Sequence, residues 1–236
     1  MILETFAILM CRQALSLVML TAPIEMEHKI CTDTSRQSYQ KMNEEEFKRK
    51  LKLMVRANEG FRNYVYEDKR GYLTMGTGHR LTKEELKKYK EGDIVNEAYL
   101  ERLFQKDFES HYKAAKGIVG FDSLSVSQKA ALIDLTFNMG PYWMKKFPNM
   151  MKEIKAFSEA ETEVLKQIHT RRMASELQYK NFAKGDFTSS KYFTQVPNRA
   201  YKNFKRLLNQ DPDWDLEEVS FQQELGEENA QTNLAF

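Results

Sequence analysis

A run of apolar residues at helical spacing opens the central part of the chain. Phe47, Leu51 and Val55 are four positions apart, which is the pattern of an amphipathic helix that buries one face. The spacing predicts a helix over residues 44–58, and the glycine two positions later is a common helix terminator. Glu59 continues the buried stripe at the helix end, which makes it a candidate functional group. The alternative is a frayed end that exposes Glu59 to solvent.

The next segment has the pattern of a β-hairpin. Residues 64–68 and 72–77 are short, aromatic and β-branched, and a turn that contains Gly71 separates them. With a connection of this length, Asp68 and Thr74 are expected to lie within a residue or two of facing each other across the strands.

After this hairpin the pattern is helical for the rest of the chain. Ser125 and Gln128 have the spacing of a capping box. The predicted helices cover residues 97–112, 125–139, 149–156, 160–178 and 198–208. One small hairpin followed by many helices predicts an α+β, mainly α, domain over residues 44–208.

The composition is that of a globular protein, and the net charge favours no partner. The chain is 42% hydrophobic and 30% charged, with a formal net charge of +2. The charges are unevenly placed, because residues 141–208 hold fourteen Lys or Arg against six acids, whereas residues 209–236 hold eight acids and no base. The sequence therefore predicts a basic body with an acidic C-terminal tail over residues 209–236.

Residues 1–43 form an N-terminal extension, an apolar segment followed by a polar linker. A signal peptide is one interpretation of its start, but Glu4 and Arg12 interrupt that pattern. No apolar run reaches about 18 residues, so no stable membrane span is expected. An amphipathic segment that packs on this protein or on a partner fits better. Cys11 and Cys31 leave the redox compartment undetermined.

Residue spacing disfavours several kinds of site. Gly76 and Gly78 lack the third glycine and the preceding hydrophobic strand of a dinucleotide site. The four histidines are scattered without metal-ligand spacing, and no serine stands in a nucleophile-elbow motif. The basic stretches "HTRRM" and "RAYKNFKR" come without a reading motif, so no nucleic-acid partner is expected.

Glu59 and Asp68, together with Thr74, remain as the candidate catalytic set. Hydrolysis of a glycosidic bond needs an acid that protonates the leaving oxygen, and a carboxylate that activates water or stabilises the transition state. The two groups need different environments, so that one stays protonated and the other ionised. A helix-end glutamate and an aspartate at a hairpin rim meet that condition, although surface acids are common enough for chance to pair them.

The stretch "EGFRNYVYEDKRGYLTMGTGH" resembles the catalytic motif of the T-even phage lysozymes and their relatives. Glu59, Asp68 and Thr74 match the family's catalytic glutamate, aspartate and threonine, with intervals of nine and six residues. His79 matches the histidine that closes the motif, and Asp107, in "LERLFQKDF", matches the aspartate that pairs with it. The resemblance implies a lysozyme-like fold with a small N-terminal β-hairpin lobe and a larger helical lobe.

Two further segments extend the resemblance over residues 44–208. "SQKAALIDLTFNMG" resembles the family's central buried helix, which implies that Phe137 and Asn138 bind substrate at the cleft. "FTQVPNRAYKNF" resembles the segment whose arginine, here Arg199, approaches the catalytic Glu59. The positive charge of this arginine favours an ionised glutamate, and burial would have to offset that effect.

The resemblance implies a muramidase. The family cleaves the β-1,4 bond between N-acetylmuramic acid and N-acetylglucosamine in bacterial peptidoglycan, with inversion. Glu59 would donate the proton while Asp68 and Thr74 position the attacking water, and neither a metal nor an organic cofactor is expected. A catalytically silent lysozyme scaffold, a structural or glycan-binding component of a virion, is the alternative, because a fold alone does not fix a function.

Three features depart from the family's pattern. An insertion around residues 158–182 would add a wall to the cleft or a docking surface, or form a surface helix pair. Arg80 and Met150 stand where relatives have other residues near the cleft. Residues 1–43 and 209–236 have no counterpart in the small free lysozymes, and they favour attachment to virion proteins of a tail or baseplate over a free endolysin. Either form would act on the cell wall in the host periplasm.

Overall fold

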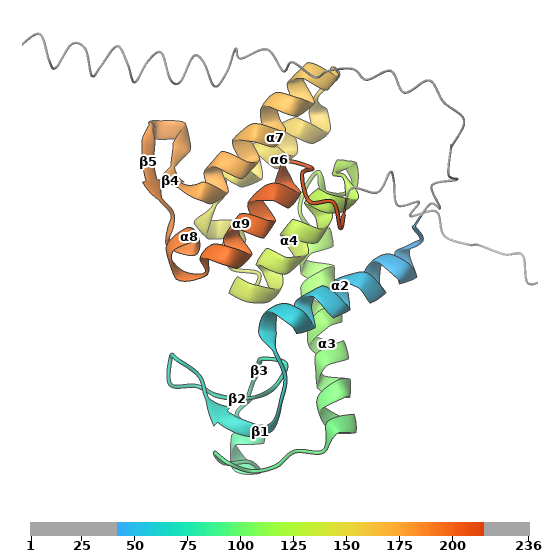
Figure 1. Cartoon of the computed structure of the whole chain (residues 1–236), viewed down its shortest axis with the longest axis vertical. Helices are drawn as coiled ribbons and strands as arrows, with labels where there is room; N and C mark the ends of the chain where they lie inside the picture. Colours follow the sequence, from blue (N-terminus) through green and yellow to red (C-terminus); the bar gives the residue numbers. More distant parts are fainter. Residues whose placement is uncertain (1–41, 215–236) are drawn as a thin grey trace, which may run out of the picture. The chain divides into compact units, whose positions relative to one another are not determined.

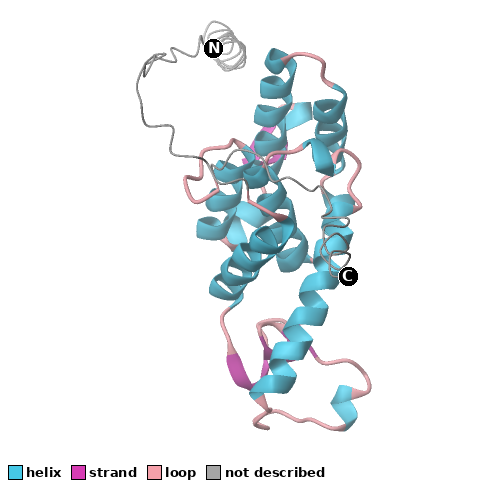
Figure 2. Ribbon diagram, turned by 90° about the vertical axis from the view of Figure 1, so that its right-hand side faces the viewer, coloured by secondary structure: helices cyan, strands magenta, loops and turns pink. Residues whose placement is uncertain are grey.

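The computed structural model describes residues 42–214 of the 236-residue chain. The predicted amphipathic segment with Cys11 and Cys31, and the acidic tail from residue 215 onward, lie outside the described residues. Within the described part, a small sheet lies at one end and most helices gather at the other (Figures 1 and 2). The prediction of an α+β, mainly α, domain is confirmed. None of the described helices has the length and apolarity needed to cross a membrane.

Helix α2, Glu44–Glu59, confirms the predicted amphipathic stripe. Its buried residues are Phe47, Leu51 and Val55. Asn43 caps the first turn because its side chain accepts a hydrogen bond from a backbone amide. The helix ends at Gly60, whose φ of 73° is a conformation that glycine adopts without strain. Glu59 is therefore the last helical residue, at the point where the chain enters the sheet.

The β-lobe is a three-stranded antiparallel sheet with the order β1-β2-β3. The strands are β1, Arg62–Glu67, β2, Leu73–Gly76, and β3, His79–Arg80. Tyr66 faces Thr74, so Asp68 lies two residues beyond the position opposite Thr74, as predicted. A small core of its own stabilises this lobe, with the buried residues Val65, Met75, Leu81, Val95, Leu100 and Leu103.

Helix α3, Glu97–Lys116, runs from the β-lobe to the helical lobe (Figure 1). The helical lobe forms around α4, Val126–Met139, whose residues are mostly buried. Ser125 and Gln128 form the predicted capping box at its start. The remaining helices are α5, Trp143–Lys146, α6, Pro148–Glu159, α7, Glu163–Gln178, α8, Lys191–Gln195, and α9, Pro197–Leu207. Short 3-10 helices cover Glu85–Lys87, Phe121–Ser123 and Phe182–Lys184.

A second hairpin shows that the prediction of helices for the whole rest of the chain is wrong. Strands β4, Tyr179–Asn181, and β5, Asp186–Ser189, pair antiparallel beside α8 (Figure 1). The rings of Tyr179, Phe182 and Phe187 pack on one another, with centroids 5.6 to 6.2 Å apart. This small aromatic cluster and the turn at Gly185 stabilise the hairpin. Its two strands are too short to show the alternation of apolar and polar residues from which strands are predicted.

The chain continues to pack on the helical lobe beyond the predicted domain end at residue 208. Trp214 is 2% exposed, and its ring meets the ring of Phe47 edge-on at 5.8 Å. The carboxylate of Asp211 accepts a hydrogen bond of 2.8 Å from the buried Arg206. The first six residues of the predicted acidic tail, 209–214, thus belong to the packed domain.

Candidate active site

Glu59 and Arg199 meet although 140 positions of sequence separate them. Glu59 ends α2, and Arg199 lies in the first turn of α9, a helix that begins at Pro197. The guanidinium Nη1 donates a hydrogen bond of 2.6 Å to Glu59 Oε1, and the arginine and glutamate side chains are 10% and 21% exposed. The structure therefore brings together the two residues that the motif pairs, in a largely buried contact.

Asp134, on α4, binds the other side of the Arg199 guanidinium. Its oxygens accept hydrogen bonds from Nε at 2.9 Å and Nη2 at 2.7 Å, and from the side-chain amides of Asn58 at 3.0 Å and Asn203 at 2.7 Å. Burial raises the pKa of Asp134, but the hydrogen bonds and charge of Arg199 outweigh it and hold that pKa below its usual value. Arg199 is thus a charged group held between two acids, Asp134 and Glu59.

Asp134 and its amide partners were not predicted from the sequence. A signal was nonetheless present, because Asp134 is a single acid within the apolar stretch "AALIDLTF". A charge inside a buried helix needs a compensating partner. Pattern alone did not indicate that this partner would be the arginine already assigned to Glu59.

Asp68 stands at the tip of the β1–β2 hairpin in a quite different environment. Its Oδ1 accepts hydrogen bonds from the backbone amides of Arg70 at 2.8 Å and Tyr72 at 2.9 Å. The Tyr72 amide contributes most to lowering the pKa of Asp68; burial raises that pKa, and the Arg70 amide and the charges of Arg70 and Arg80 lower it further, so that the pKa lies below its usual value. The carboxylate is therefore kept ionised and is fixed in orientation by the turn.

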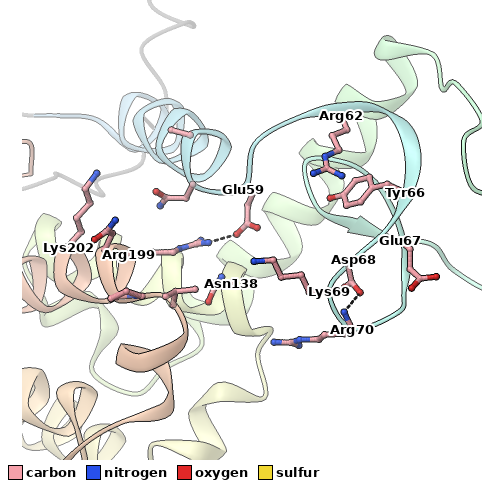
Figure 3. A pocket seen from close by; sticks show the side chains of 15 residues that line it. Glu59, Arg62, Tyr66, Glu67, Asp68, Lys69, Arg70, Asn138, Arg199 and Lys202 are labelled. Atoms are coloured by element: carbon pink, nitrogen blue, oxygen red, sulfur yellow. Dashed lines mark hydrogen bonds and ion pairs between the residues drawn. The ribbon is translucent and has the colours of Figure 1, made fainter.

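A cavity of about 720 Å³ lies between the hairpin tip and the helical lobe. Glu59, Asp68, Asn138 and Arg199 all line it (Figure 3). Several further basic residues line the same cavity: Arg62, Lys69, Arg70 and Lys202. The arrangement presents two partly exposed carboxyl groups to one space, one bound by a guanidinium and one by backbone amides, which is what general acid and base chemistry on a bound ligand requires.

Comparison with known proteins identifies this arrangement. Residues 56–176, about half of the chain, match the model of the phage lysozyme family. The chain belongs to the phage lysozyme family. A relative described as "Probable T4-type lysozyme 2", from Dictyostelium discoideum, is 29% identical over an alignment of 137 positions that covers 48% of this chain and 81% of the relative.

Family membership makes this lysozyme a glycoside hydrolase of the muramidase type, with peptidoglycan as its substrate. Glu59, Asp68 and Asn138 fall within the matched residues, whereas Arg199 lies beyond them. Arg199 nevertheless belongs to the same site, because its contact with Glu59 joins α9 to the matched part of the chain.

His79 joins the β-lobe of the lysozyme to α3. Its Nδ1 lies 2.6 Å from Asp107 Oδ2, as the motif indicates, and its Nε2 lies 3.0 Å from Glu85 Oε2. Burial lowers the pKa of His79, but the bonds to both carboxylates outweigh it and raise that pKa above its usual value. Glu85 was missed from the sequence. It also accepts the backbone amide of Thr82 and the hydroxyl of Tyr99.

Two residues expected at the cleft lie away from the cavity wall of the lysozyme. Thr74 is 4% exposed, and its hydroxyl donates to the Tyr72 carbonyl at 3.1 Å. Phe137 packs against His111, with ring centroids 4.8 Å apart, and against Phe104. Neither Thr74 nor Phe137 lines the cavity. Helical periodicity explains the second case, because Phe137 and Asn138 are neighbours and so point to different faces of α4.

The regions that depart from the family pattern also lie away from the cavity lining. Residues 158–182 form the end of α6, all of α7 and β4, and none of them lines the cavity. Met150 is fully buried in the helical core and does not line the cavity. Arg80 stacks its guanidinium on the ring of Tyr72, 3.3 Å from the centroid. Among residues 42–214, no three His, Cys, Asp or Glu side chains converge as metal ligands would.

Proposed function

We propose that the lysozyme cleaves the β-1,4 bond on the reducing side of N-acetylmuramic acid with inversion, with Glu59 as general acid and Asp68 as the carboxylate that activates water. One observation carries this proposal. The two acids line one cavity and are both partly exposed, but they differ in environment, because Glu59 is bound by the Arg199 guanidinium and Asp68 by two backbone amides. Acid and base roles require such a separation of environments.

Asp68 is suited to hold water because only one of its oxygens is committed. Oδ1 accepts the amides of Arg70 and Tyr72, and Oδ2 makes no hydrogen bond among the described residues. A hairpin turn that fixes Oδ1 aims Oδ2 in a set direction, which reduces the entropy lost when a water is oriented for attack.

Thr74 contributes through this turn. Its hydroxyl binds the carbonyl of Tyr72, and the amide of Tyr72 binds Asp68. We therefore assign Thr74 the role of positioning Asp68, in place of the direct contact with water that the motif implies.

The cavity suits an anionic polymer. Lys69 and Arg70 line it at the hairpin tip, and Lys202 lines it on α9 (Figure 3). Peptidoglycan carries carboxylates on its peptide stems, so cations on both walls raise its local concentration. This attraction weakens as salt is added.

Three variants and a stereochemical readout test this proposal. Dye release from purified peptidoglycan should fall by several orders of magnitude in Glu59→Gln and Asp68→Asn. Asp186→Asn is the matched control, because the side chain of Asp186, an acid on β5, hydrogen-bonds among residues 42–214 to Thr188 alone. Proton NMR of a soluble glycan should show the α-anomer first. An initial β-anomer would contradict inversion, and undiminished release by Glu59→Gln would contradict the assignment of the acid.

The biological setting is a separate proposal. We propose that the enzyme is attached to a virion and reaches the cell wall in the host periplasm, with residues 1–43 and the part of the tail beyond residue 214 as attachment segments. Both segments lie outside the family match, and their apolar and acidic compositions suit contacts with other proteins. Mass spectrometry of purified particles should find the chain. Its restriction to the soluble fraction of lysed cells would favour a released endolysin.

A further inference from the structure

We propose that Asp134 is a positioning residue for catalysis, which keeps a proton on Glu59 by neutralising Arg199. This inference rests on the proposed role of Glu59 as general acid. Asp134 touches no part of the cavity and would act through the arginine alone. Nothing in the motif assigns it a role.

The geometry places Asp134 as the main partner of Arg199. The side chain of Asp134 has no exposed surface, and both of its oxygens bind the guanidinium, at 2.7 Å and 2.9 Å. Within the described part of the chain, the Glu59 carboxylate receives a single hydrogen bond, from Nη1. The arginine is thus held by two bonds to the buried acid and offers one bond to the catalytic acid, which is the bidentate geometry that Arg–carboxylate pairs favour.

The charge balance follows from this geometry. A lone guanidinium within hydrogen-bond distance strongly favours the ionised form of a carboxyl group. Arg199 and Asp134 together carry no net charge, so Glu59 meets the end of a neutral pair. The effect matters because bases outnumber acids among the other charged or titratable groups on the cavity: Arg62, Tyr66 and Glu67 from β1, Asp68, Lys69 and Arg70 from the hairpin tip, and Lys202 from α9.

Asp134 is also placed to stay ionised while Glu59 changes its protonation state. The amides of Asn58 and Asn203 each donate to it, at 3.0 Å and 2.7 Å. Donors on both oxygens stabilise the charged form even without solvent. The pair can therefore remain neutral throughout a catalytic cycle in which Glu59 loses and regains its proton.

The test compares pH profiles of kcat/KM on purified peptidoglycan. Asp134→Asn keeps the shape of the side chain but leaves the Arg199 charge uncompensated, so the alkaline limb should move down by about one pH unit or more. Activity should then be lost mainly at neutral pH and recovered in acid. Asp211→Asn is the matched control, because it removes an acid from another buried arginine, Arg206, and should leave the limb in place.

An exchange variant separates charge from structure. Asn58 and Asp134 are nearly isosteric partners in one hydrogen bond, so Asn58→Asp combined with Asp134→Asn returns a carboxylate beside Arg199. The exchange should return the alkaline limb of the pH profile toward its wild-type position. If Asp134→Asn fails to fold, Asn58→Asp alone adds a second negative charge there and should move the limb upward.

The outcomes distinguish this inference from the proposed function. A uniform loss of activity or stability in Asp134→Asn, with the limb unmoved, would show that Asp134 only fastens α9 to α4. An unmoved limb in Asn58→Asp would overturn the inference as well. A wild type that releases no glycan fragments would instead defeat the proposed function. In that case NMR of ¹³C-carboxyl-labelled glutamate still reports whether the Glu59 signal titrates at lower pH in Asp134→Asn.

Discussion

The Arg199 guanidinium donates a 2.6 Å hydrogen bond to Glu59 and thereby connects the start of α9 to the end of α2. The two helices come from opposite ends of the domain, so the proposed catalytic acid, Glu59, is held by a helix of the larger lobe. The contact also shows that the candidate site includes a residue beyond the stretch that matches the family.

Removal of the guanidinium should damage both stability and activity. Arg199→Ala leaves Asp134 buried without its cation, and breaking a buried ion pair costs about 3–5 kcal/mol of the free energy of unfolding. Arg199→Lys keeps the charge but cannot make the forked contacts to Asp134 and Glu59 together. We expect kcat to fall in both variants and stability to fall more in Arg199→Ala. Denaturant unfolding and peptidoglycan cleavage measure the two effects, and a fully stable Arg199→Ala would refute the assigned pairing.

The stability of the domain should decrease as pH rises past the range in which His79 titrates. The pKa of His79 is raised in the folded state by Asp107 and Glu85 against the effect of burial. The stabilisation from His79 is therefore complete below its ordinary value of 6.5 and is lost as pH rises through the higher folded value. The free energy of unfolding should differ more between wild type and His79→Gln at pH 5 than at pH 8.

Glu85 should give the opposite dependence. Its pKa is lowered from 4.5 to about 2 by bonds from Thr82, His79 and Tyr99, which outweigh its burial. The contribution of Glu85 to the free energy of unfolding is present above pH 4.5 and is lost as pH falls toward 2.

An equal effect of His79→Gln on the free energy of unfolding at pH 5 and pH 8 would contradict the assignment for His79. Asp107→Asn should reduce the pH dependence of stability that the wild type shows.

Gly120 is expected to tolerate no side chain. Its φ is +89°, and an added Cβ would lie 2.8 Å from the carbonyl oxygen of Ile154 and 3.0 Å from Ser158. Gly185 has a similar φ of +74° with nothing within 4 Å, so Gly185→Ala experiences the backbone strain alone, about 1–2 kcal/mol. Gly120→Ala should lose about 1–3 kcal/mol more from the clash with α6. Equal midpoints in urea for the two variants would refute the close approach.

Trp214 should be necessary for a stable domain although it lies beyond the predicted domain end. It is 2% exposed and packs on Phe47, so Trp214→Ala should lower the free energy of unfolding by about 3–5 kcal/mol. Tyr201→Ala is the control, because Tyr201 is 55% exposed and its loss should change stability by no more than about 0.5 kcal/mol. Thermal unfolding of both variants measures the difference. Similar losses of stability in Trp214→Ala and Tyr201→Ala would contradict a core position for Trp214.

The elements around the motif were predictable because local patterns determine them. The apolar stripe of α2, the glycine that ends it and the capping box of α4 all lie within a few residues. The contact between His79 and Asp107 followed from the family resemblance. The helix stripe, its terminator and the capping box depend on periodicity and turn chemistry, which a single sequence displays directly.

The features that were missed depend on contacts between distant segments. Asp134 meets Arg199 across 65 positions, and no local pattern selects that partner. Thr74 and Phe137 were placed at the cleft by analogy, whereas packing turned both side chains away from it. The β4–β5 hairpin rests on a cluster of three rings that only the folded chain assembles.

The most direct test of the central claim is mass spectrometry of the fragments that wild type and Glu59→Gln release from purified peptidoglycan. We expect muropeptides with reducing N-acetylmuramic acid ends from the wild type and almost none from the variant. Fragments that end in reducing N-acetylglucosamine, or equal release by both proteins, would contradict a muramidase with Glu59 as its acid.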